Sequence, residues 1–314
     1  QYSGNTIGDS VVFGKDGIQT TDTNYVNLTA NVVPTAVTFN WNYPYVLSGA
    51  GSIGGITSLV VTDTPSVMLL TSNSYTGGTF IYGGTLAITN DNALGATANA
   101  VTLGGGRLQL NDAVTSSRAL MITANSTVGV ATNKTAQLSG AVSGTGGLTK
   151  AGVGTLSLTG SNSLSGAFVV AQGTVATSGT NQMTGLTTVG NTSGAAGVLT
   201  VSGGEFDAAY NPGNVYDSSL QVGAASGAAG TVRLNSGTLT IPKQLALGSG
   251  SGGSGSYQQA NGNASVGGFL TVGLNSDQAA FSQSGGTFIH NGPATIGAGA
   301  FGVSNAVGVA SFSG

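Results

Sequence analysis

The chain of 314 residues contains no cysteine and very few charged residues. Without cysteine there is no disulfide framework and no thiolate metal site. Seven Lys and Arg against ten Asp and Glu give a net charge of −3. This balance argues against a nucleic-acid partner, because such a partner requires several cations to neutralise its phosphates. It also argues against a basic patch that would bind a membrane surface.

Long apolar runs are lacking as well. No stretch reaches the roughly 18 consecutive apolar residues of a membrane-spanning helix, so we predict no membrane insertion. The chain starts at Gln1 rather than Met, and Gln1–Asn5 shows neither a basic region nor an apolar core of a leader. We therefore expect a mature, secreted chain whose signal peptide has been removed before Gln1.

Glycine and small polar residues are what the chain has in excess. Glycine accounts for 55 of the 314 residues, yet the mean hydropathy is +0.23 and hydrophobic residues make up 39%. A disordered chain would combine low hydrophobicity with high charge, which is the opposite of this profile. The mixture of aliphatic residues with Thr, Ser, Asn and Gly suits many short strands joined by tight turns.

The segment Leu138–Gly179 shows the pattern most clearly. Three short runs within it alternate apolar and small polar residues: Gly154–Thr159, Ala167–Val170 and Gly173–Ala176. Each run is bounded by Gly, Asn or Ser, and no window has helical periodicity. This is the alternation of half-buried strands, so the segment is predicted to be a strand–turn–strand module.

The same module occurs earlier in the chain. Three pairs of matched residues share one offset of 89 positions: Leu59 with Leu148, Leu69 with Leu158, and Asn73 with Asn162. A constant offset over such distances indicates a duplicated multi-strand unit, which is the signature of a repeat architecture.

The second half repeats with a shorter period. A Val/Leu/Ile–Gly step recurs at offsets of 33, 25, 25 and 24: Val189-Gly190, Val222-Gly223, Leu247-Gly248, Val272-Gly273 and Ile296-Gly297. A second glycine step runs in phase with it: Gly203-Gly204-Glu205-Phe206, Ser236-Gly237-Thr238-Leu239, Asn261-Gly262-Asn263-Ala264 and Gly285-Gly286-Thr287-Phe288. Two steps per period suit one coil of an all-β, parallel β-helix (β-solenoid) with about 25 residues per coil. The 33-residue spacing predicts an insertion at Tyr210–Asp217.

These repeats resemble a known family. Residues 146–175, GGLTKAGVGTLSLTGSNSLSGAFVVAQGTV, and residues 73–95, NSYTGGTFIYGGTLAITNDNALG, are similar to the passenger-associated, or autotransporter-associated, β-strand repeat of bacterial surface proteins. The resemblance implies a β-solenoid of bacterial extracellular or cell-surface type. We expect three segments: an N-terminal cap with first coils at 1–45, a passenger-type solenoid at 46–180, and a continuous 25-residue-repeat solenoid at 181–314.

The ends of such a stack suggest a structural function. The unpaired backbone groups of a terminal coil are templates for further strands, and Ala298–Gly314 has no charged residue to prevent such pairing. Our first hypothesis is an extracellular structural protein that pairs with itself in a filament or surface layer. The alternatives are an adhesin or passenger-like module that binds cell-surface glycans, and a polysaccharide-active β-helix enzyme. Polymers, glycan binding by monomers, or a soluble sugar product would distinguish the three.

Aromatic residues outside the repeat pattern are the candidate contacts. The segment 39–45, FNWNYPY, holds the only Trp, and its aromatic side chains suit either a cap, a subunit contact or a sugar contact. The predicted insertion and the C-terminal coil add others. The complete set of candidate subunit or ligand contacts is Trp41, Tyr43, Tyr45, Tyr210, Tyr216, Phe301 and Phe312.

Catalytic chemistry has little support in the sequence. Glu205 and Asp207 flank Phe206 and should point outward together if Phe206 faces the core, but no second carboxylate lies one coil away. His290, the only histidine, is expected to be an outward polar residue. The glycine patterns at 49–54 and 250–255 do not open helices, so they do not indicate nucleotide binding. We therefore predict no enzyme activity, no metal and no cofactor.

Overall fold

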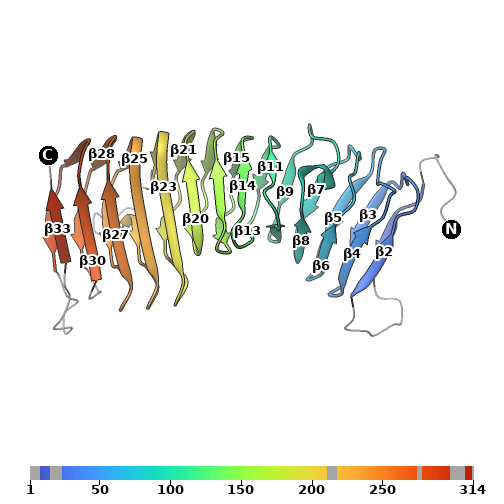
Figure 1. Ribbon diagram of the computed structural model, residues 1–314, viewed down its shortest axis with the longest axis horizontal. Helices are drawn as coiled ribbons and strands as arrows, with labels where there is room; N and C mark the ends of the chain where they lie inside the picture. Colours follow the sequence, from blue (N-terminus) through green and yellow to red (C-terminus); the bar gives the residue numbers. More distant parts are fainter. Residues whose placement is uncertain (1–7, 15–22, 211–217, 274–277, 298–307, 313–314) are drawn as a thin grey trace. The chain divides into compact units, whose positions relative to one another are not determined.

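The computed structural model describes residues 8–14, 23–210, 218–273, 278–297 and 308–312. The chain divides into two compact units, Gln1–Gly146 and Gly147–Gly314. Each unit is a stack of parallel strands arranged in two sheets (Figure 1). One sheet receives one strand from each coil, and we call it the narrow sheet. The other receives two strands from many coils, and we call it the wide sheet.

In the N-terminal unit the narrow sheet consists of β2 (Asn24–Asn27), β4 (Pro44–Ser48), β6 (Ser66–Leu69), β8 (Thr85–Ile88), β10 (Arg107–Leu110) and β13 (Ser126–Val130). The wide sheet consists of β1 (Val11–Phe13), β3 (Ala36–Phe39), β5 (Ser58–Val61), β7 (Thr79–Ile81), β9 (Val101–Leu103), β11 (Thr115–Ser116), β12 (Leu120–Ile122), β14 (Thr135–Leu138) and β15 (Val142–Gly144). Among the described residues the single helical element is the short 3-10 turn η1 (Asp91–Leu94).

In the C-terminal unit the narrow sheet consists of β16 (Leu148–Ala151), β19 (Phe168–Val170), β22 (Thr187–Val189), β24 (Ser218–Val222), β26 (Gln244–Leu247), β29 (Leu270–Val272) and β32 (Ala294–Ile296). The wide sheet consists of β17 (Thr155–Leu158), β18 (Asn162–Leu164), β20 (Gly173–Thr177), β21 (Thr180–Met183), β23 (Ala196–Asp207), β25 (Ala229–Ile241), β27 (Ser254–Gln259), β28 (Asn263–Val266), β30 (Gln278–Gln283), β31 (Thr287–His290) and β33 (Gly308–Phe312).

Strand pairing confirms the predicted parallel β-solenoid. In the C-terminal unit the register joins Val189, Val222, Leu247, Val272 and Ile296 in turn, which are the positions that the glycine steps predicted to lie one coil apart. In the N-terminal unit successive narrow-sheet strands also pair in parallel, but their partners lie closer together in the sequence, as Leu69 and Ile88 do. The predicted coil length therefore holds for the last coils, and the earlier coils are shorter.

Inward aliphatic side chains form a continuous stack in each unit. One column of the N-terminal unit runs through Leu47, Leu69, Ile88, Leu110 and Val130, each at most 1% exposed. Burying one such side chain contributes about 1.5–3 kcal/mol relative to leaving it in water. Since each coil contacts only its neighbours, the stability of the stack is a sum of such nearest-neighbour contacts.

The recurring glycines have a conformational cause. The glycine after each narrow-sheet strand adopts a positive φ, between 67° and 81°, at positions 190, 223, 248, 273 and 297. The second glycine step does the same on the wide sheet, at positions 204, 237, 262 and 286. A side chain with a Cβ rarely adopts this backbone region, so these positions of the longer coils favour glycine.

Register also locates the predicted insertion. Asp207 pairs with Thr240, 33 positions further on, whereas Leu220 pairs with Leu245, 25 positions further on. The extra residues of this coil therefore lie between Asp207 and Leu220, as the sequence predicted for 210–217. The hydroxyl of Ser219 closes this region by donating to the carbonyl oxygen of Tyr210 at 2.6 Å.

The 89-residue duplication occupies opposite sheets in its two copies. Leu69 lies in β6 of the narrow sheet, and its counterpart Leu158 lies in β17 of the wide sheet. The following strands are exchanged in the same way, because β7 belongs to the wide sheet and β19 to the narrow sheet. Both sheets require the same alternation of inward apolar residues, so one sequence pattern fits either.

The asparagines of the repeat point inward rather than outward. Asn73 is buried, and its amide donates to the carbonyl oxygen of Ala93 at 2.8 Å in the next coil. Its counterpart Asn162 is also buried and donates to Oδ1 of Asn181 at 2.8 Å. These buried amides supply hydrogen bonds between neighbouring coils.

Buried cations are a second feature that the sequence interpretation missed. Lys150 is fully buried, and its ammonium donates to the carbonyl oxygens of Ala151, Gly152 and Gln172 at 2.6 to 3.0 Å. Such a charge is tolerated inside a protein only when its donors are satisfied, and backbone carbonyls do this here.

Arg118 is the second buried cation, and it holds the η1 segment in place. Its Nε lies 2.9 Å from Oδ1 of Asp91, and its remaining nitrogens donate to the carbonyl oxygens of Asp91, Gly95, Ala96 and Asn99. The guanidinium therefore takes the place of backbone pairing in a coil that leaves the regular strand pattern.

His290 differs from its predicted orientation. It pairs with the fully buried Val266 of the previous coil, while the neighbouring Ile289 is 50% exposed. His290 is therefore on the inward side of β31, half-buried, with Nε2 2.9 Å from the carbonyl oxygen of Gly268. The outward orientation that we predicted for His290 is wrong, because the neighbouring Ile289 points outward and successive residues of a strand point to opposite faces.

No helix in the described part of the chain is long and apolar enough to cross a membrane.

Candidate contact faces of the solenoid

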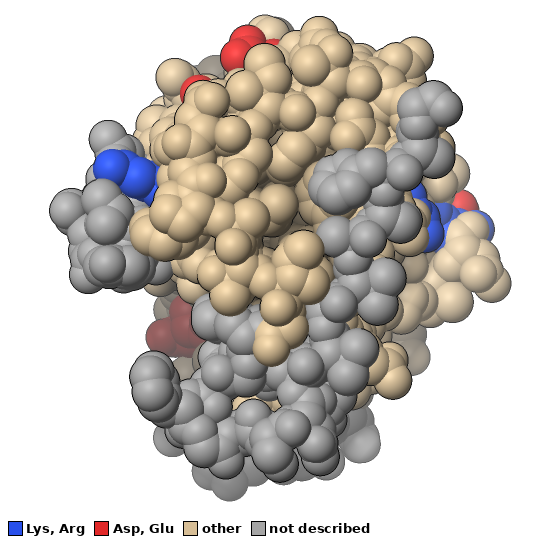
Figure 2. Space-filling view, turned by 90° about the vertical axis from the view of Figure 1, so that its left-hand side faces the viewer, with Lys and Arg blue, Asp and Glu red and all other residues tan. Residues whose placement is uncertain are grey.

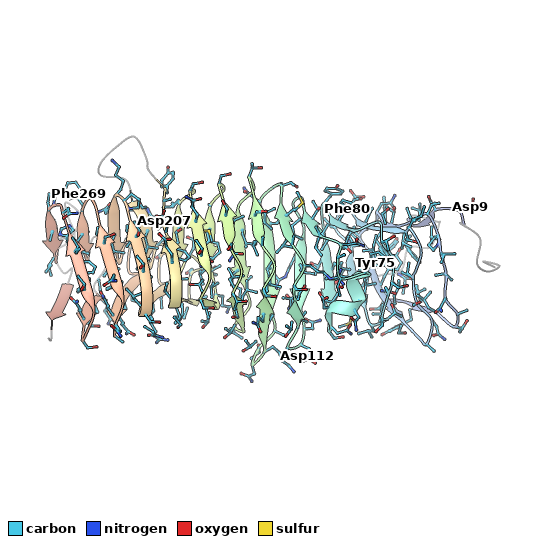
Figure 3. The ribbon with its side chains drawn as sticks, turned by 90° about the horizontal axis from the view of Figure 1, so that it is seen from above. Asp9, Tyr75, Phe80, Asp112, Asp207 and Phe269 are labelled. Atoms are coloured by element: carbon cyan, nitrogen blue, oxygen red, sulfur yellow. The ribbon has the colours of Figure 1, made fainter. Side chains whose placement is uncertain are left out.

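Two aromatic rings lie together on the outer surface of β7. Phe80 is half-buried and Tyr82, which directly follows the strand, is 50% exposed. Their ring centroids are 6.0 Å apart with planes inclined by 20°, so the two rings are stacked with nearly parallel planes. Figure 3 shows Phe80 on the outside of the coil and Tyr75 inside it. We call the Phe80–Tyr82 pair the aromatic platform.

Glycines make room for both rings. A Cβ on Gly104, one coil further on, would lie 2.5 Å from Cδ1 of Tyr82, so the ring rests directly on the backbone there. A Cβ on Gly78 would lie 3.4 Å from the ring of Phe80. Because the rings lie against backbone, they cannot turn inward, and their faces stay available at the surface.

The positions around the platform carry hydroxyl groups and no charge. Parallel pairing places Val60 before and Thr102 after Phe80 on the outer face, and Thr102 is followed by Met121. The hydroxyl of Thr123 lies next to Tyr82 across Gly104. The platform is therefore an apolar surface edged by neutral hydrogen-bonding groups.

A surface hollow lies at the corner where the wide sheet passes to the narrow sheet. It is lined by Trp41, Asn42, Asp63 and Thr64, from turns that follow β3 and β5. Asp63 adopts a φ of 53°, which an aspartate tolerates better than most residues. Trp41 and Tyr43 are both half-buried, so each keeps part of its side chain at the surface. Their role as contacts stays a prediction.

Tyr45 differs from its two neighbours because it points inward. It is only 6% exposed, and its ring lies 5.3 Å from the rings of both Phe13 and Phe39. Burial raises the pKa of the Tyr45 phenol, with a smaller contribution from Tyr43. Its side chain is part of an aromatic core in the first coils, where a ligand would reach little of it.

The remaining candidate contacts are located only in part. Tyr210 is half-buried at the start of the predicted insertion. Phe312 ends β33, whose backbone pairs with β30 opposite Gln283. Tyr216 and Phe301 lie outside the described residues, and nothing tests these four as contacts.

The carboxylate pair on β23 has the predicted orientation. Phe206 is fully buried between Glu205, which is exposed, and Asp207, which is half-buried. Burial raises the pKa of Asp207, and the neighbouring Glu205 raises it further. Across the neighbouring strands Glu205 pairs with Thr180 and Thr238, so no additional carboxylate completes an acid–base set at this position.

Within the described ranges no group of three or more His, Cys, Asp or Glu residues lies close enough to hold a metal ion. In the view onto the end of the C-terminal unit, the coloured charged side chains of the described residues lie toward the margins of the molecule (Figure 2).

The aromatic platform was missed in the sequence because it sits inside a repeat. We singled out aromatic residues that break the pattern, whereas Phe80 and Tyr82 obey it at positions i and i+2. The signal was present in the spacing, since two residues two positions apart on a strand share one face. The glycines one coil later, at 104–106, complete the signal.

Two segments of the chain, residues 67–88 and 148–176, match the Passenger-associated-transport-repeat family. They coincide with the two copies of the repeat that the sequence resemblance identified. The parallel coils and these matches make the chain similar to the passenger repeats of autotransporters.

A relative extends this similarity. Over 131 residues, 41% of this chain, the sequence is 36% identical to the Adhesin BmaC autotransporter of Brucella suis biovar 1 (strain 1330). The matched part is 4% of the length of that adhesin. No solved structure matches the chain. The resemblance to autotransporter passenger repeats is therefore confirmed.

Proposed function

We propose that this chain is an adhesin-like surface module that binds neutral glycans on its outer face, without cleaving them. The aromatic platform is the observation that carries the proposal. The exposed ring of Tyr82, stacked beside the half-buried ring of Phe80, offers an apolar surface of the kind that the CH face of a sugar ring can stack on. The relative, named as an adhesin, supports a binding role.

The surroundings of the platform favour a neutral sugar over other ligands. Thr102 and Thr123 provide hydroxyl groups that both donate and accept hydrogen bonds, as sugar hydroxyls require. No charged residue occupies the outer positions in register with Phe80, so an anionic polymer gains nothing there. A rigid, preorganised platform loses little conformational freedom on binding.

The experiment is binding of the purified protein to an array of neutral oligosaccharides, followed by titration of each oligosaccharide that binds. Tyr82→Ala and Phe80→Ala should each weaken binding at least about tenfold, since buried aromatic contacts dominate such sites. Gly104→Ala is a sharper variant: its Cβ would displace the ring of Tyr82, and the φ of Gly104 lies outside the left-handed region.

Tyr25→Ala is the matched control, because Tyr25 is 78% exposed on the narrow sheet, away from the platform. If Tyr82→Ala still bound the oligosaccharide and Tyr25→Ala did not, the aromatic platform would not be the binding site. An unchanged length of the oligosaccharide after incubation is expected, and shortening would favour a polysaccharide-active enzyme.

We infer a second candidate function, self-assembly into a filament or surface layer, from the N-terminal end of the stack. An apolar cavity of about 220 Å³ lies there, lined by residues including Val11, Val26 and Leu28. Among the described strands β1 pairs only with β3, and β2 only with β4. A second copy of the chain would be the partner.

Electron microscopy of purified protein tests this assembly. Polymers should form in the unaltered chain and be lost in Val26→Lys, which places a charge in the apolar cavity. Thr38→Lys, on the outer face of β3, is the control with the same added charge. Filaments that persist in Val26→Lys would rule out this end as the contact.

A further inference from the structure

A polar groove crosses the outer face of the wide sheet in the C-terminal unit. Its volume is about 270 Å³, and its polar lining comes from β25, β27, β30 and the turns beside them. The side chains that matter below are Arg233, Asn235, Gln258, Ser282 and Ser284. We call this the Arg233 groove, and its lining shares no residue with the aromatic platform.

Coil stacking assembles the groove from residues far apart in sequence. Arg233 pairs with Gln258, and Gln258 pairs with Ser282, so three successive coils place their outward side chains in one row. Beneath the row, Tyr257 is fully buried and donates from its hydroxyl to Oε1 of Gln259 at 2.9 Å. The floor of the groove is therefore fixed by core packing.

Arg233 is the single charged residue that lines the groove. Its Nε donates to Oε1 of Gln258 at 3.1 Å, which orients the guanidinium plane. No carboxylate among the described residues forms an ion pair with it. The terminal guanidinium nitrogens are thus held at the surface with their charge uncompensated, which is the arrangement that binds a carboxylate with two parallel hydrogen bonds.

The other lining groups indicate what carries that carboxylate. Asn235 and Gln258 each carry an amide, and Ser282 and Ser284 each carry a hydroxyl. The two hydroxyls donate to the carbonyl oxygens of Tyr257 and Gln259, and their oxygens can still accept; each amide uses one of its two N–H groups within the protein, so the groove keeps groups that donate and accept. The groove lacks the large apolar side chains that would anchor a peptide; Ala260 is the only apolar residue in its lining. A ligand rich in hydroxyl groups fits this lining better than a peptide does.

We propose that the Arg233 groove binds a carboxylate-bearing sugar, such as a uronic acid unit of an acidic polysaccharide. The guanidinium of Arg233 pairs with the carboxylate, and the amides and hydroxyls of the next two coils bind the sugar hydroxyls. This site is separate from the aromatic platform, so the protein has one site for neutral sugars and another for acidic sugars.

Titration of the full chain with oligogalacturonate and with its methyl ester tests the site. The ester keeps the rings and hydroxyls but loses the negative charges. Oligogalacturonate should bind, and the methyl ester should bind at least about tenfold more weakly, because a charge-assisted pair contributes most of the difference. Equal binding of the two ligands would overturn the proposal.

Substitutions then assign the binding to Arg233. Arg233→Gln should weaken binding of oligogalacturonate at least about tenfold, and Arg233→Lys should restore only part of it, because lysine cannot form the two parallel hydrogen bonds. Lys243→Gln removes one positive charge elsewhere in the same unit and should change binding less than twofold. Equal losses in Arg233→Gln and Lys243→Gln would show a net-charge effect and refute the groove.

The test also separates this site from the proposed glycan-binding function. Tyr82→Ala should leave oligogalacturonate binding unchanged, and Arg233→Gln should leave binding of neutral oligosaccharides unchanged. Loss of oligogalacturonate binding in Tyr82→Ala would place the acidic sugar on the aromatic platform and overturn the Arg233 groove.

Discussion

Residues 46–180 and the later, longer coils, residues 196–297, differ in one kind of buried polar group: both bury neutral amides, but only the first also buries cations among the described residues. The first group buries the cations Arg118 and Lys150, whose charges are met by Asp91 and by backbone carbonyl oxygens. The second group buries neutral amides: Gln244, which lies between hydroxyl groups of two neighbouring coils, and Gln259.

The difference follows from how regular the coils are. In the longer coils, glycines with positive φ turn the chain at both corners, and strands as long as β25 pair over most of their length. In the shorter coils, segments such as η1 leave the pattern and expose carbonyl oxygens that need donors. A long cationic side chain supplies several donors from one position.

The largest effect should come from Arg118→Ala. This substitution leaves Asp91 without its partner and removes the donors of the carbonyls around η1, so we expect a loss of about 3–5 kcal/mol in local stability. Hydrogen exchange of the amides in residues 91–100 measures it. Arg107→Ala is the control, because the half-buried Arg107 donates mainly to Gln109. If the amides of residues 91–100 were equally protected from hydrogen exchange in both variants, Arg118 would not hold this segment in place.

Lys150→Met should have the next largest effect. Methionine keeps the apolar stem of the side chain but leaves three carbonyl oxygens without the ammonium, which should cost about 1–3 kcal/mol. Denaturant unfolding, followed by exchange of the amides in 148–176, measures the loss. Lys134→Met is the control at an exposed lysine. Stabilisation by Lys150→Met would contradict the assignment.

Gln244→Leu should cost less, about 1–2 kcal/mol, because the group removed is neutral. The substitution leaves the hydroxyls of Ser218 and Thr271 without their amide partner. Denaturant unfolding measures the loss, and Gln221→Leu on the neighbouring strand β24 is the control, since Gln221 is only half-buried. If Gln244→Leu lost more stability than Lys150→Met, buried neutral groups would stabilise these coils more than buried cations do, which contradicts our prediction.

Asp207→Asn should raise stability slightly, and only where Asp207 is ionised. The pKa of Asp207 is higher in the folded chain than in the unfolded chain, so the protonated form favours folding and this contribution is lost as pH rises through the folded pKa. The variant should gain about 1–2 °C in Tm at pH 7. At about pH 3, below the usual pKa of aspartate, the gain should vanish.

Asp112→Asn should have the smallest effect. Asp112 and Lys134 form an exposed ion pair with 2.7 Å between the charged atoms, and Figure 3 shows Asp112 at the outer edge of its loop. The hydrogen bond from Lys134 lowers the pKa of Asp112. Solvent screens such pairs, so Tm should be unchanged at neutral pH, in contrast to the buried pair of Arg118. A clear fall in Tm would show that exposed pairs also stabilise these coils.

The sequence predicts the coils of this fold better than it predicts the direction of individual side chains. The Val/Leu/Ile–Gly step anticipated each offset from Val189 to Ile296, because only glycine suits the turn that follows. The inward direction of Tyr45 and His290 was not anticipated. Which side chains point inward depends on the residue at which the strand begins, and the sequence does not fix that residue; a shift by one position turns every side chain to the other face.

The candidate sites were harder to predict for a different physical reason. The Arg233 groove combines residues from successive coils, and they become neighbours only through the coil register. The buried Lys150 looks like an ordinary exposed lysine in the sequence, because its donors are satisfied by carbonyl oxygens that leave no mark on residue type. Backbone partners of this kind cannot be read from side-chain patterns.

The most direct test of the account is one glycan array that holds neutral and acidic oligosaccharides, probed with the unaltered protein, Tyr82→Ala and Arg233→Gln. We predict that the unaltered protein binds both classes, that Tyr82→Ala loses only the neutral class, and that Arg233→Gln loses only the acidic class. Absence of sugar binding by the unaltered protein, or loss of both classes in either variant, would contradict the account.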